Sequence, residues 1–470
     1  MCREVGASPW IIVSPTYTAE EHRNLLEYLG GPTTTRYGKL RAQHGQTQAW
    51  TESFDEIIIE IGNEQWNQLF RPLAFPWQGE FFGAFSDYLF HEAQQSPYYN
   101  KGKIRYMVGG WSINGGQWND KVIGHATRAD QMCIATYTGG GFDTEDLVAI
   151  GSDETFKQRL YYIPRVVRPK MDSFTELTAR FNKTPAIYES GPGYDLPAPG
   201  KGFDPKDELI GKSIAQAITT IDGFMYGQSR GYGAQCFFGF RPGTRWASHS
   251  FMNDLRPHAA WLALQMRNRY CAGDLVEVPK VDLPEVLTAA KTNSGEVKTR
   301  KMPAVPGVPT VMAYAYRDGA RWSVLLSSRQ LNGTVDINLE FPFQPKQAGE
   351  LYTLTADQPH AGNIHETEVE IQRRSMEDIG AKYSLRLPPF SLAVLQVEQS
   401  SAAAKLESSP TREPLFRTWT SADGKYTVEA KLIKADGAFV YLQRKDNGKQ
   451  IKVPAEKLSP KDKDYLKSRE

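Results

Sequence analysis

The sequence predicts an α/β region followed by two all-β regions. Short runs of apolar, β-branched residues alternate with helical patterns up to about residue 273, which is typical of parallel βα units. From 274 to 398 the pattern changes to alternating segments joined by Asp-Gly and Asn-Gly turns, as in antiparallel sheets. A stretch rich in Ser, Ala and Pro then separates the last residues from the rest, as a flexible linker would.

Six strands are expected in the α/β region, at 9–15, 56–63, 103–110, 131–139, 184–191 and 234–240. Helical patterns accompany them, for example at 19–29, 212–228 and 256–270. Six βα units are two fewer than a closed (β/α)8 barrel of the TIM type contains. We therefore expect residues 1–273 to supply strands three to eight of such a barrel. The first two units, and any signal peptide, would then lie upstream of Met1 in an untruncated chain.

The two all-β regions differ in size. Residues 274–398 are expected to form a β-sandwich, and residues 399–414 a linker. Residues 415–470 are expected to form a small β-barrel of about five short strands that ends in a charged helix. Three closely spaced turn signals mark this last region: Asp423-Gly424, Asp436-Gly437 and Asn447-Gly448.

Composition argues against several classes of partner and cofactor. The chain has 55 Lys and Arg against 54 Asp and Glu, so no overall field points to nucleic acid. No apolar run approaches the ~20 residues of a membrane span. The eight histidines form no HExxH motif, and we expect neither a metal site nor a cofactor. The four cysteines are scattered without CxxC spacing and are expected to be free thiols: Cys2, Cys133, Cys236 and Cys271.

Two acidic residues end predicted strands. In EIIIEIGNE, strand alternation places Glu60 and Glu64 on one face and the odd-numbered isoleucines on the other. Glu64 lies at the C-terminal end, where barrel enzymes carry their catalytic groups, and Glu60 is expected to be a paired structural acid one layer deeper. Glu189 ends TPAIYESG in the same way. Two carboxyls across a barrel mouth suit glycosidic cleavage, although solvated loop acids fit the periodicity equally well.

A family resemblance favours the first interpretation. IEIGNEQWN and AIYESGPGY resemble the signature strands of clan A glycoside hydrolases, and are most similar to those of α-L-arabinofuranosidases. CREVGASPWIIV and RPHAAWLALQMRNRYCAGDLVEV also resemble segments of that branch, so the resemblance covers roughly residues 1–398. In the family the two acids end the fourth and seventh strands. Here they end the second and fifth predicted strands, which are also three units apart.

The resemblance implies a retaining glycosidase that removes α-L-arabinofuranosyl groups from plant or algal polysaccharide. Glu64 would be the general acid/base, Glu189 the nucleophile, and Asn63 a ligand of the sugar 2-hydroxyl. Tyr137 could donate a hydrogen bond to the nucleophile, though it could equally be a core aromatic. Trp111 and Trp246 could stack on a sugar face, or they could simply pack in their loops. Trp66 could wall the subsite beside Glu64.

Two alternatives stay open. The first is another clan A specificity, such as a β-xylosidase or an endo-glucanase. The second is an inactive carbohydrate-binding protein, because two of the eight barrel strands are missing from the prediction. The full-length protein is expected to be extracellular or periplasmic, although no signal peptide opens this chain.

The last region has a resemblance of its own. Residues 416–466 resemble the small homology domain first described in a yeast endocytic adaptor. The resemblance implies an SH3-like barrel that binds a peptide or a surface ligand such as a glycan.

Overall fold

The chain forms two compact units, residues 1–403 and 404–470. The computed structural model describes these residues: 2–112, 118–138, 156, 159–161, 163–192, 210–240, 247–250, 255–278, 285–288, 291–294, 299–302, 305–400, 417–435, 438–444 and 450–467.

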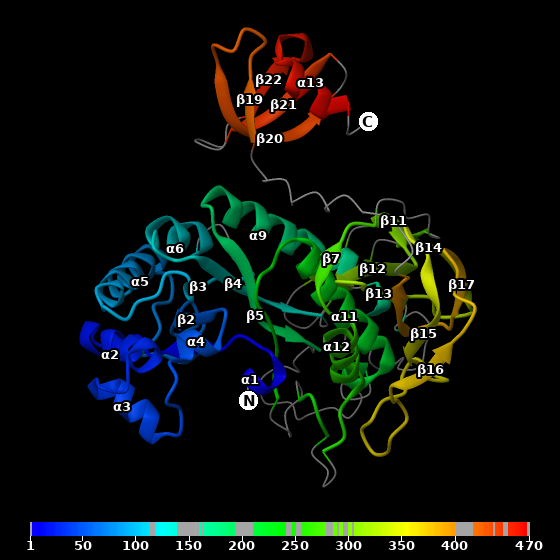
Figure 1. Ribbon diagram of the computed structural model, residues 1–470, viewed down its shortest axis with the longest axis horizontal. Coiled ribbons are helices and arrows are strands. Elements are labelled where there is room, and N and C mark those ends of the chain that lie inside the picture. Colours follow the sequence, from blue (N-terminus) through cyan, green and yellow to red (C-terminus); the bar gives the residue numbers. More distant parts are fainter. Residues whose placement is uncertain are drawn as a thin grey trace. The chain divides into compact units, whose positions relative to one another are not determined.

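The first unit contains a parallel sheet of six strands that curls into a half-barrel (Figure 1). Its spatial order follows the chain, and all five neighbouring pairs are parallel. Each strand lies inside one of the six predicted ranges, so these predictions are confirmed: β1 (Trp10–Val13), β2 (Ile57–Ile61), β3 (Ile104–Gly109), β4 (Gln131–Tyr137), β5 (Thr184–Gly191) and β6 (Gln235–Phe237).

The sheet does not close on itself within the described residues, because no pairing among them joins β6 to β1. A complete eight-stranded barrel is therefore not formed by this part of the chain. The expectation of further strands upstream stays a prediction.

Helices connect and cover these strands. α2 begins with a capping box, in which Thr18 and Glu21 satisfy each other's backbone N–H, and α11 begins with Ser213 as its N-cap. The predicted helices at 19–29, 212–228 and 256–270 correspond to α2, α11 and α12. The helices of this part are α1 (Cys2–Val5), α2 (Ala19–Gly30), α3 (Arg36–Gln43), α4 (Trp50–Ser53), η1 (Gln68–Phe70), α5 (Gly79–Gln94), α6 (Asp120–His125), the π-helical η3 (Ile163–Val167), α9 (Arg168–Arg180), α11 (Ile214–Ser229) and α12 (Ala259–Tyr270).

The two faces of the sheet bury different side chains. Ile57, Ile59 and Ile61 of β2 belong to the large core that the sheet shares with its helices. Ile58 belongs instead to a small inner cluster with Met107, Cys133 and Ala186. The alternation predicted for EIIIEIGN is thus confirmed, and it leaves Glu60 on the inner face.

Antiparallel sheets follow from residue 274 onward. A six-stranded sheet has the order β16-β15-β18-β13-β12-β7, and β14 pairs with β17 in a separate ribbon. One face of the large sheet packs on α11 and α12, and the other shares a core with the ribbon. The strands are β7 (Asp274–Val276), β8 (Glu285–Thr288), β9 (Lys291–Ser294), β10 (Thr299–Met302), β11 (Val305–Pro309), β12 (Val311–Asp318), β13 (Arg321–Ser328), β14 (Val335–Glu340), β15 (Pro345–Leu354), β16 (Gln372–Met376), β17 (Lys382–Leu387) and β18 (Leu392–Gln399).

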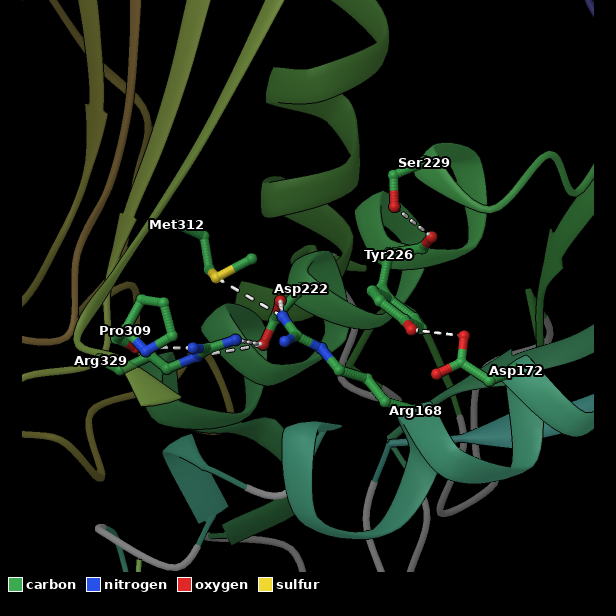
Figure 2. Close-up of polar contacts among 8 residues, drawn as sticks. All are labelled: Arg168, Asp172, Asp222, Tyr226, Ser229, Pro309, Met312 and Arg329. Atoms are coloured by element: carbon green, nitrogen blue, oxygen red, sulfur yellow. Dashed lines mark hydrogen bonds and ion pairs between the residues drawn. The ribbon is translucent and has the colours of Figure 1, made fainter. Parts of the chain in front are cut away.

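A buried ion pair fastens the large antiparallel sheet to the α/β region (Figure 2). Arg329, directly after β13, donates to Asp222 on α11, and both side chains are fully buried. Arg329 also donates to the carbonyl of Pro309 at 2.7 Å. Arg168, at the start of α9, lies 3.8 Å from the other carboxylate oxygen of Asp222. Because removing one partner of such a pair leaves an uncompensated buried charge, this contact specifies how the two regions pack.

The second unit contains an antiparallel sheet in the order β19-β20-β21-β22. Trp419 is the largest side chain of its core, and Asp462 accepts a hydrogen bond from Arg417 at 2.8 Å. The described residues form four strands where about five were expected, and their pairings do not close a barrel; the terminal helix is confirmed. The elements are β19 (Arg417–Thr420), β20 (Thr427–Ala435), β21 (Phe439–Arg444), β22 (Gln450–Pro454), η4 (Ala455–Lys457) and α13 (Pro460–Lys467).

Within the described residues, no helix is both long enough and apolar enough to cross a membrane.

Candidate active site

A tight turn after β2 presents Glu64. Gly62 has φ of 68° and Glu64 has φ of 46°, so both lie in the left-handed region that side chains other than glycine rarely adopt. A Cβ on residue 62 would meet Nε2 of Gln65 at 2.2 Å, which explains the glycine. The strained backbone at Glu64 turns the chain away from the strand direction, as at many functional sites.

A β-bulge in β5 presents both Tyr188 and Glu189. Ile134 of β4 pairs with Ile187, but the next residue, Ala135, pairs with Glu189, so Tyr188 is the extra residue. Ile187 packs in the helix-facing core, and Tyr188 packs against the inner cluster. Strict alternation would return Glu189 to the helix-facing side. The bulge redirects the side chain of Glu189, so that the consecutive residues Tyr188 and Glu189 both lie on the inner face of the sheet.

Hydrogen bonds from two tyrosines hold the two acids. The hydroxyl of Tyr137, the last residue of β4, donates to Oε2 of Glu189 at 2.6 Å. The hydroxyl of Tyr188 donates to Oε1 of Glu64 at 2.8 Å. The side-chain amide of Asn67 donates to Oε2 of Glu64 at 2.7 Å. The ends of β2, β4 and β5 thus bring Glu64 and Glu189 together at one edge of the sheet.

The electrostatics of this group depend mainly on burial. Burial raises the pKa of Glu189, and the nearby charge of Glu64 raises it further, whereas the hydrogen bond from Tyr137 lowers it. Burial and the two carboxylates raise the pKa of Tyr137 and of Tyr188 far above the ordinary value for tyrosine. Both phenols therefore stay protonated and remain hydrogen-bond donors at physiological pH.

A third acid lies deeper on the inner face. Glu60 is 1% exposed and accepts hydrogen bonds from the indole N–H of Trp10 at 2.9 Å and from the thiol of Cys133 at 3.4 Å. Burial raises the pKa of Glu60 to about 8. The expectation of a paired acid is wrong in its physical detail: among the described residues no cation pairs with Glu60, and neutral donors from β1 and β4 hold it instead.

The remaining predicted site residues are placed as follows. Asn63 is half-buried beside Glu64. Trp66 and Trp111 stack on each other with ring centroids 5.0 Å apart and planes at 7°, so each covers one face of the other. Trp77, which is 61% exposed, meets Trp111 edge-on at 5.7 Å. Trp246 lies outside the described residues.

Three side chains of the site were missed in the sequence: Tyr188, Asn67 and Trp10. Asn67 follows Glu64 by three residues, a spacing that suits a turn, and the quoted segment GNEQWN contains it. Tyr188 had no usable signal, because the alternation rule assigns it and Glu189 to opposite faces.

Among the described residues, no group of three or more His, Cys, Asp or Glu side chains is placed to hold a metal ion.

The fold is similar to that of several solved α-L-arabinofuranosidases. An α-L-arabinofuranosidase from Thermotoga maritima, solved with arabinose, superposes with a TM-score of 0.62 at 18% identity, over 84% of this chain and 77% of that one. A family 51 α-L-arabinofuranosidase from Bifidobacterium longum gives 0.59 at 14% identity, over 84% and 77%. The family 51 arabinofuranosidase from Xanthomonas axonopodis pv. citri gives 0.58 at 15% identity, over 84% and 76%.

Sequence comparisons give one result for the whole chain and another for its C-terminal residues. No curated protein matches the chain by sequence. Residues 407–470 match the family model of SLA1 homology domain 1. The chain therefore has a fold similar to that of the family 51 α-L-arabinofuranosidases and a match to SLA1 homology domain 1 at its C-terminal end, so both resemblances noted in the sequence are confirmed.

Proposed function

We propose that this chain is a retaining glycoside hydrolase that removes α-L-arabinofuranosyl groups from plant or algal polysaccharide. The observation that carries the proposal is the pair of half-buried carboxyls at the ends of β2 and β5, each held by a tyrosine hydroxyl. A retaining glycosidase needs such a pair, with one group as nucleophile and the other as proton donor. The fold similarity to α-L-arabinofuranosidases supports the choice of sugar.

Glu189 is the proposed nucleophile. An oxygen of its carboxylate attacks the anomeric carbon, and the bond to the leaving oxygen breaks as Glu64 donates its proton to that oxygen. Tyr137 stabilises the ionised form of Glu189 by donating to Oε2, which offsets part of the effect of burial. Asn63, next to Glu64, is the proposed ligand of the sugar 2-hydroxyl.

Glu64 then acts as the base in the second step. Having lost its proton to the leaving group, it accepts one from water, and that water attacks the anomeric carbon and releases Glu189. Tyr188 and Asn67 donate to the two oxygens of Glu64 and hold its carboxyl in place. The reaction uses side chains alone and needs no cofactor.

The aromatic residues have proposed binding roles. Trp66 and Trp111 would wall the side of the site next to Glu64 as one stacked pair, and Trp246 would contact the sugar, as its sequence position suggests. The C-terminal domain would bind a peptide or a surface ligand, independently of the catalytic residues.

A panel of aryl glycosides tests the proposal. The chain is expected to hydrolyse nitrophenyl α-L-arabinofuranoside faster than the β-xyloside or cello-oligosaccharides, and NMR of the first-formed sugar should show retained configuration. Faster hydrolysis of the β-xyloside or of cello-oligosaccharides would assign another specificity. Saccharide binding without turnover of any substrate would instead identify a carbohydrate-binding protein.

A further inference from the structure

Tyr188 has a position that strand alternation does not account for. It is the extra residue of the β5 bulge and directly precedes Glu189. Its hydroxyl nevertheless reaches Glu64, on the turn after β2, at 2.8 Å. The bulge therefore ties the carboxyl after β2 to the strand that carries the other carboxyl.

Glu64 has few other constraints on its side chain. Asn67, its second donor, belongs to the same short turn, and the backbone N–H of Asn67 also bonds to the carbonyl of Glu64 at 2.7 Å. Among the described residues, the bond from Tyr188 is the side-chain hydrogen bond to Glu64 that comes from outside this turn. Without this bond, no donor from β5 would reach Oε1 of Glu64 among the described residues.

We infer that Tyr188 is a positioning residue for the acid/base: its hydroxyl fixes the carboxyl of Glu64 relative to Glu189 and stabilises the carboxylate that forms when Glu64 gives up its proton. This inference rests on the proposed function. The bond to Oε1 is charge-assisted once Glu64 is ionised, and such bonds are stronger than neutral ones. Tyr188 thereby lowers the barrier to proton transfer, which matters most when the leaving group is a poor one.

The surroundings of Glu64 allow Tyr188 to act in this way at working pH. Among the described residues, the titratable groups that interact with Glu64 include Glu60 on β2, Tyr137 on β4, and Tyr188 and Glu189 on β5. Burial holds the pKa of Tyr188 far above its ordinary value. The phenol therefore keeps its proton in both steps and cannot compete with Glu64 as the acid.

The substitution Tyr188→Phe removes the hydroxyl and keeps the ring. Tyr106→Phe, on β3, is the matched control, because its hydroxyl is buried without a hydrogen-bond partner among the described residues. Measured as kcat/KM, Tyr188→Phe should slow a glycoside with a poor leaving group about 10- to 100-fold, the loss expected for one hydrogen bond to a charged group. A dinitrophenyl glycoside, which needs no proton, should change less than about twofold.

A second measurement does not depend on turnover. In protein labelled with 13Cδ-glutamate, the Glu64 signal can be identified by its loss in Glu64→Gln. Its chemical shift should change in Tyr188→Phe, because Oε1 loses its hydrogen-bond donor, and should stay in place in Tyr106→Phe.

The outcomes separate the inference from the proposed function. If the unmodified chain hydrolyses no glycoside, the proposed function fails, and the NMR signal alone decides whether Tyr188 holds Glu64. Equal loss of rate with both leaving groups would show a merely structural role and overturn the inference. An unchanged chemical shift of Glu64 in Tyr188→Phe would overturn it as well.

Discussion

The ends of β2 and β5 present their acids in different ways. Glu189 stays inside the sheet, where its backbone pairs with Ala135 and its partner Tyr137 comes from the neighbouring strand. Glu64 lies beyond the end of β2, on a turn with positive φ, and hydrogen bonds from side chains hold it. A sheet ladder thus fixes one acid, whereas side-chain contacts fix the other.

The difference suits the two proposed roles. A nucleophile must stand at one place relative to the anomeric carbon, and the pairing of Glu189 with Ala135 in the neighbouring strand provides that. An acid/base must serve the leaving oxygen and then the incoming water, and Glu64 lies outside the sheet ladder, on a turn where side chains hold it. Substitutions at Glu189, at Glu64, and then at Tyr137 and Glu60 test this difference between the two acids.

Replacement of the nucleophile should have the largest effect. Glu189→Ala removes the group that forms the covalent intermediate, so kcat should fall on the order of 10⁴- to 10⁶-fold. Azide should restore turnover of an activated aryl glycoside and give a glycosyl azide of inverted configuration. If azide rescues Glu64→Ala with inversion instead, the two roles are exchanged.

Replacement of the acid/base should have an effect that depends on the substrate. Glu64→Ala should reduce kcat/KM for poor leaving groups about 10²- to 10⁴-fold, the usual contribution of general acid catalysis. A dinitrophenyl glycoside should retain nearly its full kcat/KM. The dependence of log(kcat/KM) on leaving-group pKa should become steep, and an unchanged slope would contradict the assignment of Glu64.

Removal of the Tyr137 hydroxyl, which donates to Glu189, should reduce activity less and change its pH dependence in a defined direction. Tyr137→Phe removes the hydrogen bond that lowers the pKa of Glu189, so that pKa should rise. Because Glu189 must be ionised to attack, the acidic limb of kcat/KM should move to higher pH, with a loss of about 10- to 100-fold at the optimum. Movement of the limb to lower pH would argue against this contact.

The smallest effect on activity, and a clear one on stability, is expected at Glu60. Its pKa is about 8 in the folded chain against an ordinary 4.5, so the folded state holds a proton that the unfolded state releases between those values. Stability should therefore fall as pH rises through this window, by about 1.4 kcal/mol per pH unit. Glu60→Gln, compared by urea unfolding with exposed Glu52→Gln, should remove that decline and leave activity at pH 7 nearly unchanged.

Much of this arrangement follows from local sequence patterns, and the rest does not. The six strands and the inner position of Glu60 follow from apolar periodicity, which depends on residues close in the chain. The bulge at Tyr188 arises from a mismatch between β4 and β5, which no single strand reveals. Trp10 donates to Glu60 across 50 residues, and that contact needs the pairing of β1 with β2 to be known.

The central claim is that Glu189 forms a covalent bond to the sugar. A 2-deoxy-2-fluoro arabinofuranosyl donor with a good leaving group should inactivate the chain and leave one sugar attached, because the fluorine slows the second step more than an activated first step. Peptide mapping by mass spectrometry should find the label on Glu189, in the segment AIYESGPGY. A label on Glu64, or complete turnover without any labelled peptide, would contradict the account.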